Sequence, residues 1–283
     1  MRIDTATISL EPRTAAGCLD LAVMSYGRHL RSILQLWLPM AVPACFIVYL
    51  LSRHFEWGLW WPALVLWFAT SIFGVLLGLV AIPAAFGEPF RMTQLFGRLE
   101  WPAPLLLLRG LMLRVAEAAG LCLAVVPGIL IAVRGGFFVE QAVLQSMERR
   151  RHDRRTAVLV REETAELLGR GLAIFLYCLM LGAVLFATLD ILMWLLFGEP
   201  ILLGRLLDAM RAGDAAADEL GRLLWRDPLV QTALTAVGLL VYPIGRLAWF
   251  FCYVDLRVRR DCWDVELEFV QEARRLRKIQ HAN

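Results

Sequence analysis

Long hydrophobic stretches separated by short charged segments dominate the pattern along the chain. Residues 59–86 carry no charged side chain, and a helix of about 20 apolar residues is long enough to cross the hydrocarbon of a bilayer. Comparable stretches recur at 36–52, 105–126, 129–146, 171–197 and 229–253. The pattern therefore predicts an all-α, polytopic helical membrane protein with about six transmembrane helices, or five as the alternative, and with interfacial amphipathic helices.

The segments at the two ends of the chain are less hydrophobic. Residues 1–13 are expected to form an extended arm, and 14–35 place apolar residues at helical spacing with arginines between them. That pattern is typical of a helix lying on the membrane surface. Residues 255–283 are expected to form a charged, helical, cytoplasmic tail, so that 1–283 make up a single integral membrane domain.

Composition excludes a soluble globular protein of this size. Hydrophobic residues make up 59% of the 283 residues and charged residues 19%, and the mean hydropathy is +0.61. A soluble domain contains roughly 45 to 50% apolar residues and could not bury such an excess. The net charge of +3 is small, so the placement of the arginines carries more information than their number.

The basic residues determine how often 105–146 is expected to cross. If it crosses once, the arginine-rich segment 149–161 and the basic tail face the outside, against the tendency of basic loops to stay in the cytoplasm. If it crosses twice, turning at Pro127–Gly128, both basic segments and both termini are cytoplasmic. Only the 53–58 turn after the first span and the net-acidic 199–227 segment are then exported. We therefore expect six crossings and a multi-pass protein of the bacterial inner (cytoplasmic) membrane.

Charged residues inside the hydrophobic stretches are the candidate functional groups, because charged side chains in a membrane are costly and usually have partners or a function. They are Arg114, Glu117, Arg134, Glu140, Asp190 and Arg246. Equal distances from the predicted turns suggest three ion pairs: Arg114 with Glu140, Arg134 with Asp190, and Arg246 with Glu117. These residues either tie helices together or contact a ligand. If they contact a ligand, Arg134 and Arg246 are the expected anion contacts.

The tail carries a second candidate set. Oppositely charged residues four positions apart share a helix face, and this spacing joins Asp255 to Arg259, Arg257 to Asp261 and Arg260 to Asp264. These pairs are expected either to stiffen the helix or to form a docking surface for a protein partner at the cytoplasmic face. The candidate docking residues are Asp255, Arg257, Arg259, Arg260 and Asp264.

No pattern indicates catalysis, a metal or a cofactor. The six cysteines occur singly without a CxxC, and the four histidines have no partner at a useful interval. The basic segment 148–170 is expected to attract anionic membrane lipids rather than nucleic acid, because no aromatic pattern accompanies it. We therefore expect a non-enzyme with no cofactor, no metal and no nucleic-acid partner.

Two motifs resemble a bacterial membrane family. PGILIAVR at 127–134 resembles a PGI-x-LAVR signature, and YVDLRVRR at 253–260 resembles a YxDLRxR motif. Both are similar to motifs of the membrane domain associated with glycerophosphodiester phosphodiesterases, and the order of segments is similar over most of the chain. The resemblance implies a membrane fold. It does not imply hydrolysis, because no stretch corresponds to the catalytic barrel.

The expected function is therefore that of a scaffold or an accessory subunit of a membrane-associated complex. The alternative is a small transporter or lipid-handling protein with an arginine-lined site in the membrane. The ligand or cargo, the partner and the oligomeric state do not follow from the sequence.

Overall fold

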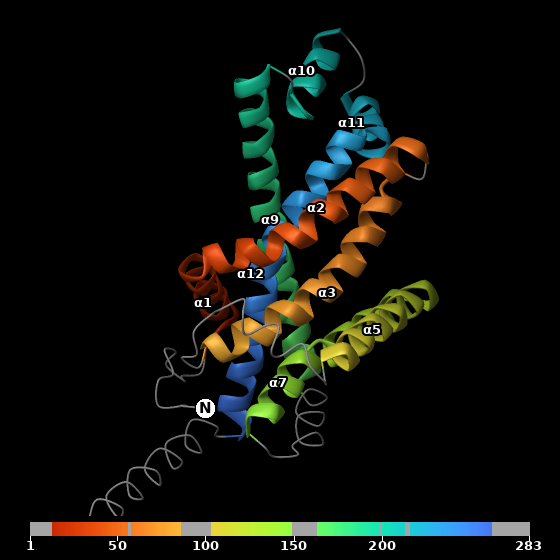
Figure 1. Cartoon of the computed structure of the whole chain (residues 1–283). Helices are drawn as coiled ribbons and strands as arrows, with labels where there is room; N and C mark the ends of the chain where they lie inside the picture. The colour runs from red at the N-terminus through yellow and green to blue at the C-terminus, as the bar shows by residue number, and fades with distance from the viewer. Residues whose placement is uncertain are drawn as a thin grey trace, which may run out of the picture. The chain divides into compact units, whose positions relative to one another are not determined.

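The protein is all-α in the part that the structure describes. The computed structural model describes residues 13–55, 58–85, 103–148, 163–198, 200–212 and 216–261. The helices in these ranges are α1 (Ala15–Arg28), α2 (Leu30–His54), α3 (Trp60–Ala85), α5 (Ala103–Leu123), α6 (Val125–Gly135), α7 (Phe138–Glu148), α9 (Thr164–Phe197), α10 (Leu203–Ala212), α11 (Ala216–Arg226) and α12 (Pro228–Asp261) (Figure 1). The prediction of an all-α polytopic protein is confirmed.

Five helical segments in the described ranges are long and apolar enough to cross a membrane. They are Leu30–His54, Trp60–Ala85, Val125–Val143, Thr164–Phe197 and Pro228–Arg260. The sixth predicted span, 105–126, corresponds to α5. This helix is 21 residues long but is not among the five. Arg109, Arg114 and Glu117 leave it no 18-residue stretch with two or fewer charged residues.

Two predicted boundaries are wrong. The interfacial helix expected over 14–35 ends at Arg28, capped by His29, and α2 then runs from Leu30 to His54 without a break. The first span, expected over 36–52, therefore begins earlier, at Leu30, and Pro39 and Pro43 lie inside its helix. Of the extended arm expected at 1–13 only Arg13 is described, and the tail beyond Asp261 lies outside the described residues.

The hairpin in the middle of the chain exists, but it turns three residues earlier than predicted. Helices α5 and α6 pack along each other and are joined at Ala124, whose backbone is extended. Pro127 lies in the first turn of α6, where its missing N–H breaks no helical hydrogen bond. Proline at this position therefore begins a helix and does not mark the turn itself.

Gly128 sets the distance between the two helices of the hairpin. A Cβ at Gly128 would lie 2.7 Å from the Leu121 backbone nitrogen, and one at Gly120 would lie 2.9 Å from the Cα of Gly128. Real Cβ atoms do not approach other atoms this closely. The two helices can therefore pack at this distance only because both positions are glycine.

Replacing Gly128 with alanine should destabilise the protein by about 1–3 kcal/mol, because the added methyl group must push α5 away from α6. The matched control is Gly169→Ala on α9, where a Cβ meets no atom within 4 Å. That change should be neutral or stabilising by up to about 1 kcal/mol, since alanine favours helix over glycine. Denaturation by SDS in mixed micelles, followed by circular dichroism, measures both; equal effects would contradict the close packing.

The chain divides into two compact units. Unit 1 comprises 1–32, 74–174 and 244–283, and unit 2 comprises 33–73 and 175–243. Helices α2, α3, α9 and α12 therefore contribute residues to both units.

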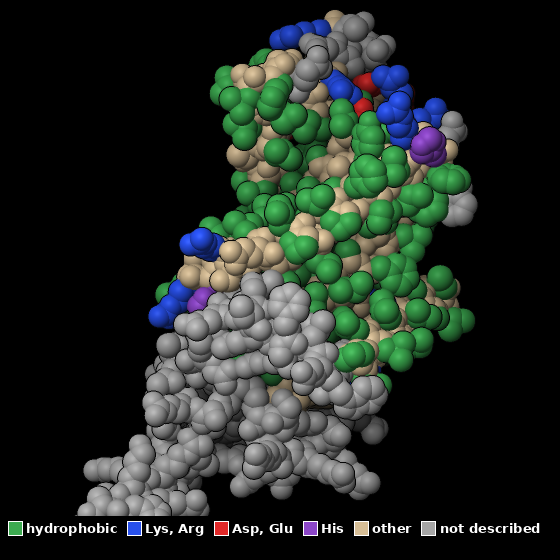
Figure 2. All heavy atoms as spheres, in the orientation of Figure 1, with side chains coloured by type: hydrophobic (Ala, Val, Ile, Leu, Met, Phe, Trp, Pro, Cys, Tyr) green, Lys and Arg blue, Asp and Glu red, His purple; other side chains and the backbone are tan. Residues whose placement is uncertain are grey.

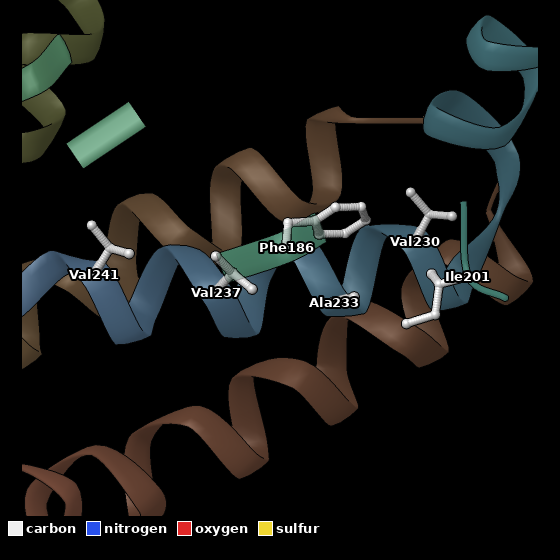
Figure 3. Packing of buried hydrophobic residues seen from close by; sticks show 6 residues of the cluster. All are labelled: Phe186, Ile201, Val230, Ala233, Val237 and Val241. Carbon is white, nitrogen blue, oxygen red and sulfur yellow. The ribbon is translucent and has the colours of Figure 1, made fainter. Parts of the chain in front are cut away.

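Unit 2 has its core along one side of α12. Val230, Ala233, Val237 and Val241 repeat at helical spacing, and Phe186 of α9 packs against this row (Figure 3). A second small cluster joins α2 to α12 through alanines at 41 and 44, which pack against Leu239. The row of small and β-branched side chains makes α12 the central helix of this unit.

Much of the remaining hydrophobic surface is exposed. On α9 the exposed large residues include Phe175, Met180, Val184, Ile191, Leu195 and Phe197, and hydrophobic side chains cover most of the visible face of the described chain (Figure 2). A soluble protein rarely exposes apolar surface of this extent. In a bilayer the same surface contacts lipid chains.

Candidate functional site: an ionic cluster around Asp255

A buried carboxylate organises the polar contacts of unit 1. Asp255 on α12 is 2% exposed. Its Oδ2 accepts hydrogen bonds from the Arg170 guanidinium at 2.6 Å and from Arg259 Nε at 3.0 Å, and its Oδ1 accepts from the Arg13 backbone N–H at 2.5 Å. Three donors on α9, α12 and the segment before α1 therefore converge on one side chain.

Two further carboxylates complete the cluster. Glu166 contacts both Arg170, at 2.8 Å, and Arg259, at 2.7 Å. Arg260 pairs with Glu163, immediately before α9. The cluster thus contains three arginines and three carboxylates, so its formal charges cancel.

The cluster forms because two helices carry the same spacing of charge. Glu166 and Arg170 are four residues apart on α9, as Asp255 and Arg259 are on α12, and residues at this spacing lie on one helix face. Arg170 also donates to the Arg13 carbonyl oxygen at 3.1 Å. The segment before α1 is therefore held by both its N–H and its C=O.

Only part of this cluster was predicted. The Asp255–Arg259 pair is confirmed, whereas Glu166, Arg170 and Arg13 were not among the candidate residues. Glu166 and Arg170 could have been found from the sequence, because they are four residues apart at the start of the hydrophobic stretch of α9. The backbone contact of Arg13 could not have been found in this way.

The other residues of the expected docking tail differ in their accessibility. Asp255 and Arg257 are buried inside the chain, at 2% and 4% exposure, and cannot form a docking surface. Arg260 is exposed and pairs with Glu163. The expected pair of Arg260 with Asp264 lies outside the described residues, as does the side chain of Asp261, the expected partner of Arg257.

Two thiols lie beside the cluster. Cys18 on α1 and Cys252 on α12 are fully buried, and both are free cysteines. Their side chains are hydrogen-bonded to each other, and this bond, together with burial, raises the pKa of the Cys18 thiol. Cys18 is therefore protonated at neutral pH and packs as a small apolar side chain.

A second ion pair joins α7 to α12. Glu140, at 1% exposure, accepts a hydrogen bond from Arg246 at 2.8 Å, and Arg246 also donates to the Gly136 carbonyl oxygen at 3.1 Å. Next to this pair the ring of Phe137 stacks on Trp249 with centroids 4.7 Å apart. The pair and the stacked rings together hold α7 against α12.

These contacts correct two of the three predicted ion pairs. Glu140 was expected to pair with Arg114, and Arg246 with Glu117. Arg114 instead contacts Glu117 on its own helix, at 2.7 Å. Glu140 pairs with Arg246. Equal distance from a turn gave the wrong partners, because it ignores which face of each helix a side chain occupies.

Asp190 has a different role from the one predicted. Its carboxylate accepts hydrogen bonds from the backbone N–H groups of Ile201, Leu202 and Leu203, at 2.6, 2.9 and 2.7 Å. The first N–H groups of a helix have no acceptor within it, so Asp190 caps α10. Three backbone donors thus take the place of the guanidinium expected from Arg134.

Asp190→Ala should release α10, because three N–H groups lose their acceptor. Trypsin should then cleave after Arg205 several-fold faster than in the unchanged protein, as the helix opens more often. Asp218→Ala, at an exposed position on α11, serves as the matched control and should leave the rate unchanged. An unchanged rate for Asp190→Ala would show that the cap does not hold α10.

Arg134 is the one predicted intramembrane residue for which, within the described ranges, no partner is found. Its side chain is exposed at the last turn of α6. Within the described ranges there is also no set of three histidine, cysteine or acidic side chains placed to hold a metal ion. The charged side chains described here therefore serve mainly to join helices.

The comparisons with known proteins do not extend this description. No family model matches the chain, and no curated protein or solved structure is significantly similar to it.

Proposed function

We propose that the protein is a non-enzymatic, multi-pass protein of the bacterial inner membrane that acts as a scaffold or accessory subunit of a membrane-associated complex. In this proposal both termini lie in the cytoplasm. This orientation keeps the arginine-rich segment 149–161 and the basic end of the chain inside, as the distribution of positive charge favours.

The observation that carries the proposal is the neutral cluster around Asp255. Its arginines and carboxylates pair with one another, and such pairing suits a structural role better than substrate binding. It also fixes the last turns of α12 to α9 and to the segment before α1. The chain after Asp261 therefore leaves from a firmly held helix end, which suits a segment that docks a partner.

The alternative, a transporter with an arginine-lined site, has less support. Of its two expected anion contacts, Arg246 is already engaged by Glu140 and the Gly136 carbonyl. An anionic substrate would have to displace a buried carboxylate in order to bind this arginine. Such an exchange is costly because it leaves Glu140 buried without its partner.

The resemblance to the membrane domain associated with glycerophosphodiester phosphodiesterases is part of this proposal. The two motifs that carry it lie at structurally demanding positions. Gly128 of the PGI motif packs too closely against α5 to carry a Cβ, and Asp255 of the YxDLRxR motif is the centre of the ionic cluster. We propose on this basis that the chain shares the membrane fold of that family without its catalytic domain.

A truncation tests the scaffold. The full-length protein and a chain ending at Asp261, which retains the whole Asp255 cluster, are purified in mild detergent and their stoichiometric partners identified. The proposal expects one partner at a fixed ratio with the full chain, lost on truncation although the truncated chain unfolds at an unchanged SDS concentration. Arg226→Glu, an exposed change on α11, is the control that should retain the partner. The same partner set for both chains, or none with either, would reject the proposal.

A further inference from the structure

The tip of the α5–α6 hairpin is hydrophobic and exposed. Leu123, Val125 and Val126 are 85%, 64% and 66% exposed. From Ala118 to Val133 the chain contains no charged residue. A turn that reached the water on the far side of a membrane would usually carry polar residues, and this turn has none beyond Cys122.

The tip also leaves few backbone N–H groups without an acceptor. Four N–H groups at a helix start lack an acceptor within the helix. Here the Ala124 N–H donates to the Gly120 carbonyl at 2.9 Å, and Pro127 has no N–H. Of these N–H groups, only those of Val125 and Val126 remain without such an acceptor. The carbonyl groups after Gly120 at the end of α5 likewise have no donor within their own helix.

The Glu140–Arg246 pair fixes the depth at which the hairpin starts. Arg246 follows Asp227, at the start of α12, by 19 residues, or ~28 Å of helix. The hydrocarbon layer is ~30 Å thick. Asp227 and Arg246 enclose an uncharged run of α12, residues 228–245, and we infer that these two charges mark its two membrane boundaries. Glu140, bonded to Arg246, then lies at the same boundary as Arg246.

The hairpin is too short to cross from this boundary. Ala124 precedes Glu140 by 16 residues, at most ~24 Å of helix. The interruption between α6 and α7 at Gly136 shortens this further. Even a hairpin perpendicular to the membrane would end inside the hydrocarbon, in agreement with its apolar tip.

The same arithmetic places Arg134 near the headgroups. It precedes Glu140 by six residues, so it lies ~9 Å or less below the boundary. A long arginine side chain can extend over such a distance toward the interface. Within the described ranges Arg134 has no carboxylate partner, and a planar guanidinium binds phosphate oxygens through two parallel hydrogen bonds. A phospholipid phosphate is the anion present at that depth.

We propose that α5 and α6 form a re-entrant hairpin that enters one leaflet and returns to the same side, with its tip in the hydrocarbon and Arg134 bound to a lipid phosphate. The partner of this surface is the membrane leaflet itself. The proposal is independent of the scaffold function. It leaves α2, α3, α9 and α12 as the crossing helices, an even number that returns both termini to one side without a crossing by α6.

Photoactivatable phospholipids test the tip in the unmodified chain. The full-length protein is reconstituted in vesicles containing a lipid with a diazirine at the end of the acyl chain or, separately, in the headgroup, and cross-linked peptides are mapped by mass spectrometry. In parallel, a charged, membrane-impermeant maleimide is applied to each side, and modification of the native Cys122 is read from its peptide. Cys122 is exposed on the protein, so protection can come only from its surroundings.

The expected result is acyl-chain cross-linking at 121–126. The maleimide, applied from either side, should modify Cys122 to less than a tenth of the level reached when the reagent has free access to the thiol. Modification from the side opposite Glu140 would show that the hairpin crosses, and modification from the same side would show that its tip is in water. Protection without acyl-chain cross-linking would show that protein covers the tip. Each of these three outcomes overturns the proposal.

The phosphate contact has its own variant. Arg134→Glu should reduce headgroup cross-linking at 130–138 at least fivefold, whereas Arg134→Lys, which keeps the positive charge, should retain most of it. Arg226→Glu, an exposed arginine on α11, is the matched control and should leave cross-linking at 130–138 unchanged. Equal cross-linking in Arg134→Glu and the unchanged protein would refute the phosphate contact.

Discussion

Replacing Arg170 with leucine should destabilise the protein by about 3–5 kcal/mol, because it leaves a buried carboxylate without its principal counter-charge. Arg170 and Asp255 are 8% and 2% exposed and lie 2.6 Å apart. Water cannot easily take the place of the lost guanidinium at such a site. The free energy of unfolding, measured by SDS titration in mixed micelles, is the direct test.

Two further variants separate the buried charge from other effects of the substitution. Arg260→Leu removes an arginine of the same cluster whose side chain is 53% exposed, and should cost less than about 0.5 kcal/mol. Adding Asp255→Asn to Arg170→Leu removes the uncompensated charge and should recover part of the loss. If Arg170→Leu and Arg260→Leu cost the same, Asp255 does not depend on Arg170.

Glu140→Leu should be the second strongly destabilising change, again by about 3–5 kcal/mol, since Arg246 is then left without a carboxylate. The Arg246 side chain is 12% exposed, and that of Glu140 is 1% exposed. Arg246→Leu alone should cost a similar amount. The double variant, with leucine at both positions, should be far closer to the unchanged protein, because two apolar side chains can replace a buried pair.

A double-mutant cycle over these four proteins gives the coupling between the two side chains. Thermal denaturation in detergent and SDS titration should rank the variants in the same order. A double variant that is as unstable as the sum of the two single variants would mean that Glu140 and Arg246 act independently. The geometry of the pair would then have no energetic importance.

The linear sequence predicts the helices and the contacts within a helix, but not the contacts between helices. The long apolar runs predicted the helices because length and composition alone suffice for crossing. The Asp255–Arg259 pair was predictable because both residues lie on one helix, where spacing fixes the face. Contacts between helices were not predictable in this way, and Glu140 with Arg246 is the clearest case.

The reason lies in the rotation and bending of helices. Depth along a hairpin follows from counting residues, but the direction of a side chain depends on how each helix is turned about its axis. The break between α6 and α7 at Gly136 changes that direction just before Glu140. Arg114 is left facing Glu117, one turn along α5, and the counted partner is lost.

The contact between Arg13 and Asp255 also constrains the order in which the protein can be assembled. Its two residues are separated by 242 positions, and Cys18 on α1 meets Cys252 over a similar interval. During synthesis α1 is therefore made well before the part of α12 that covers it. Cys18 remains uncovered until the more than 200 intervening residues and α12 have been translated.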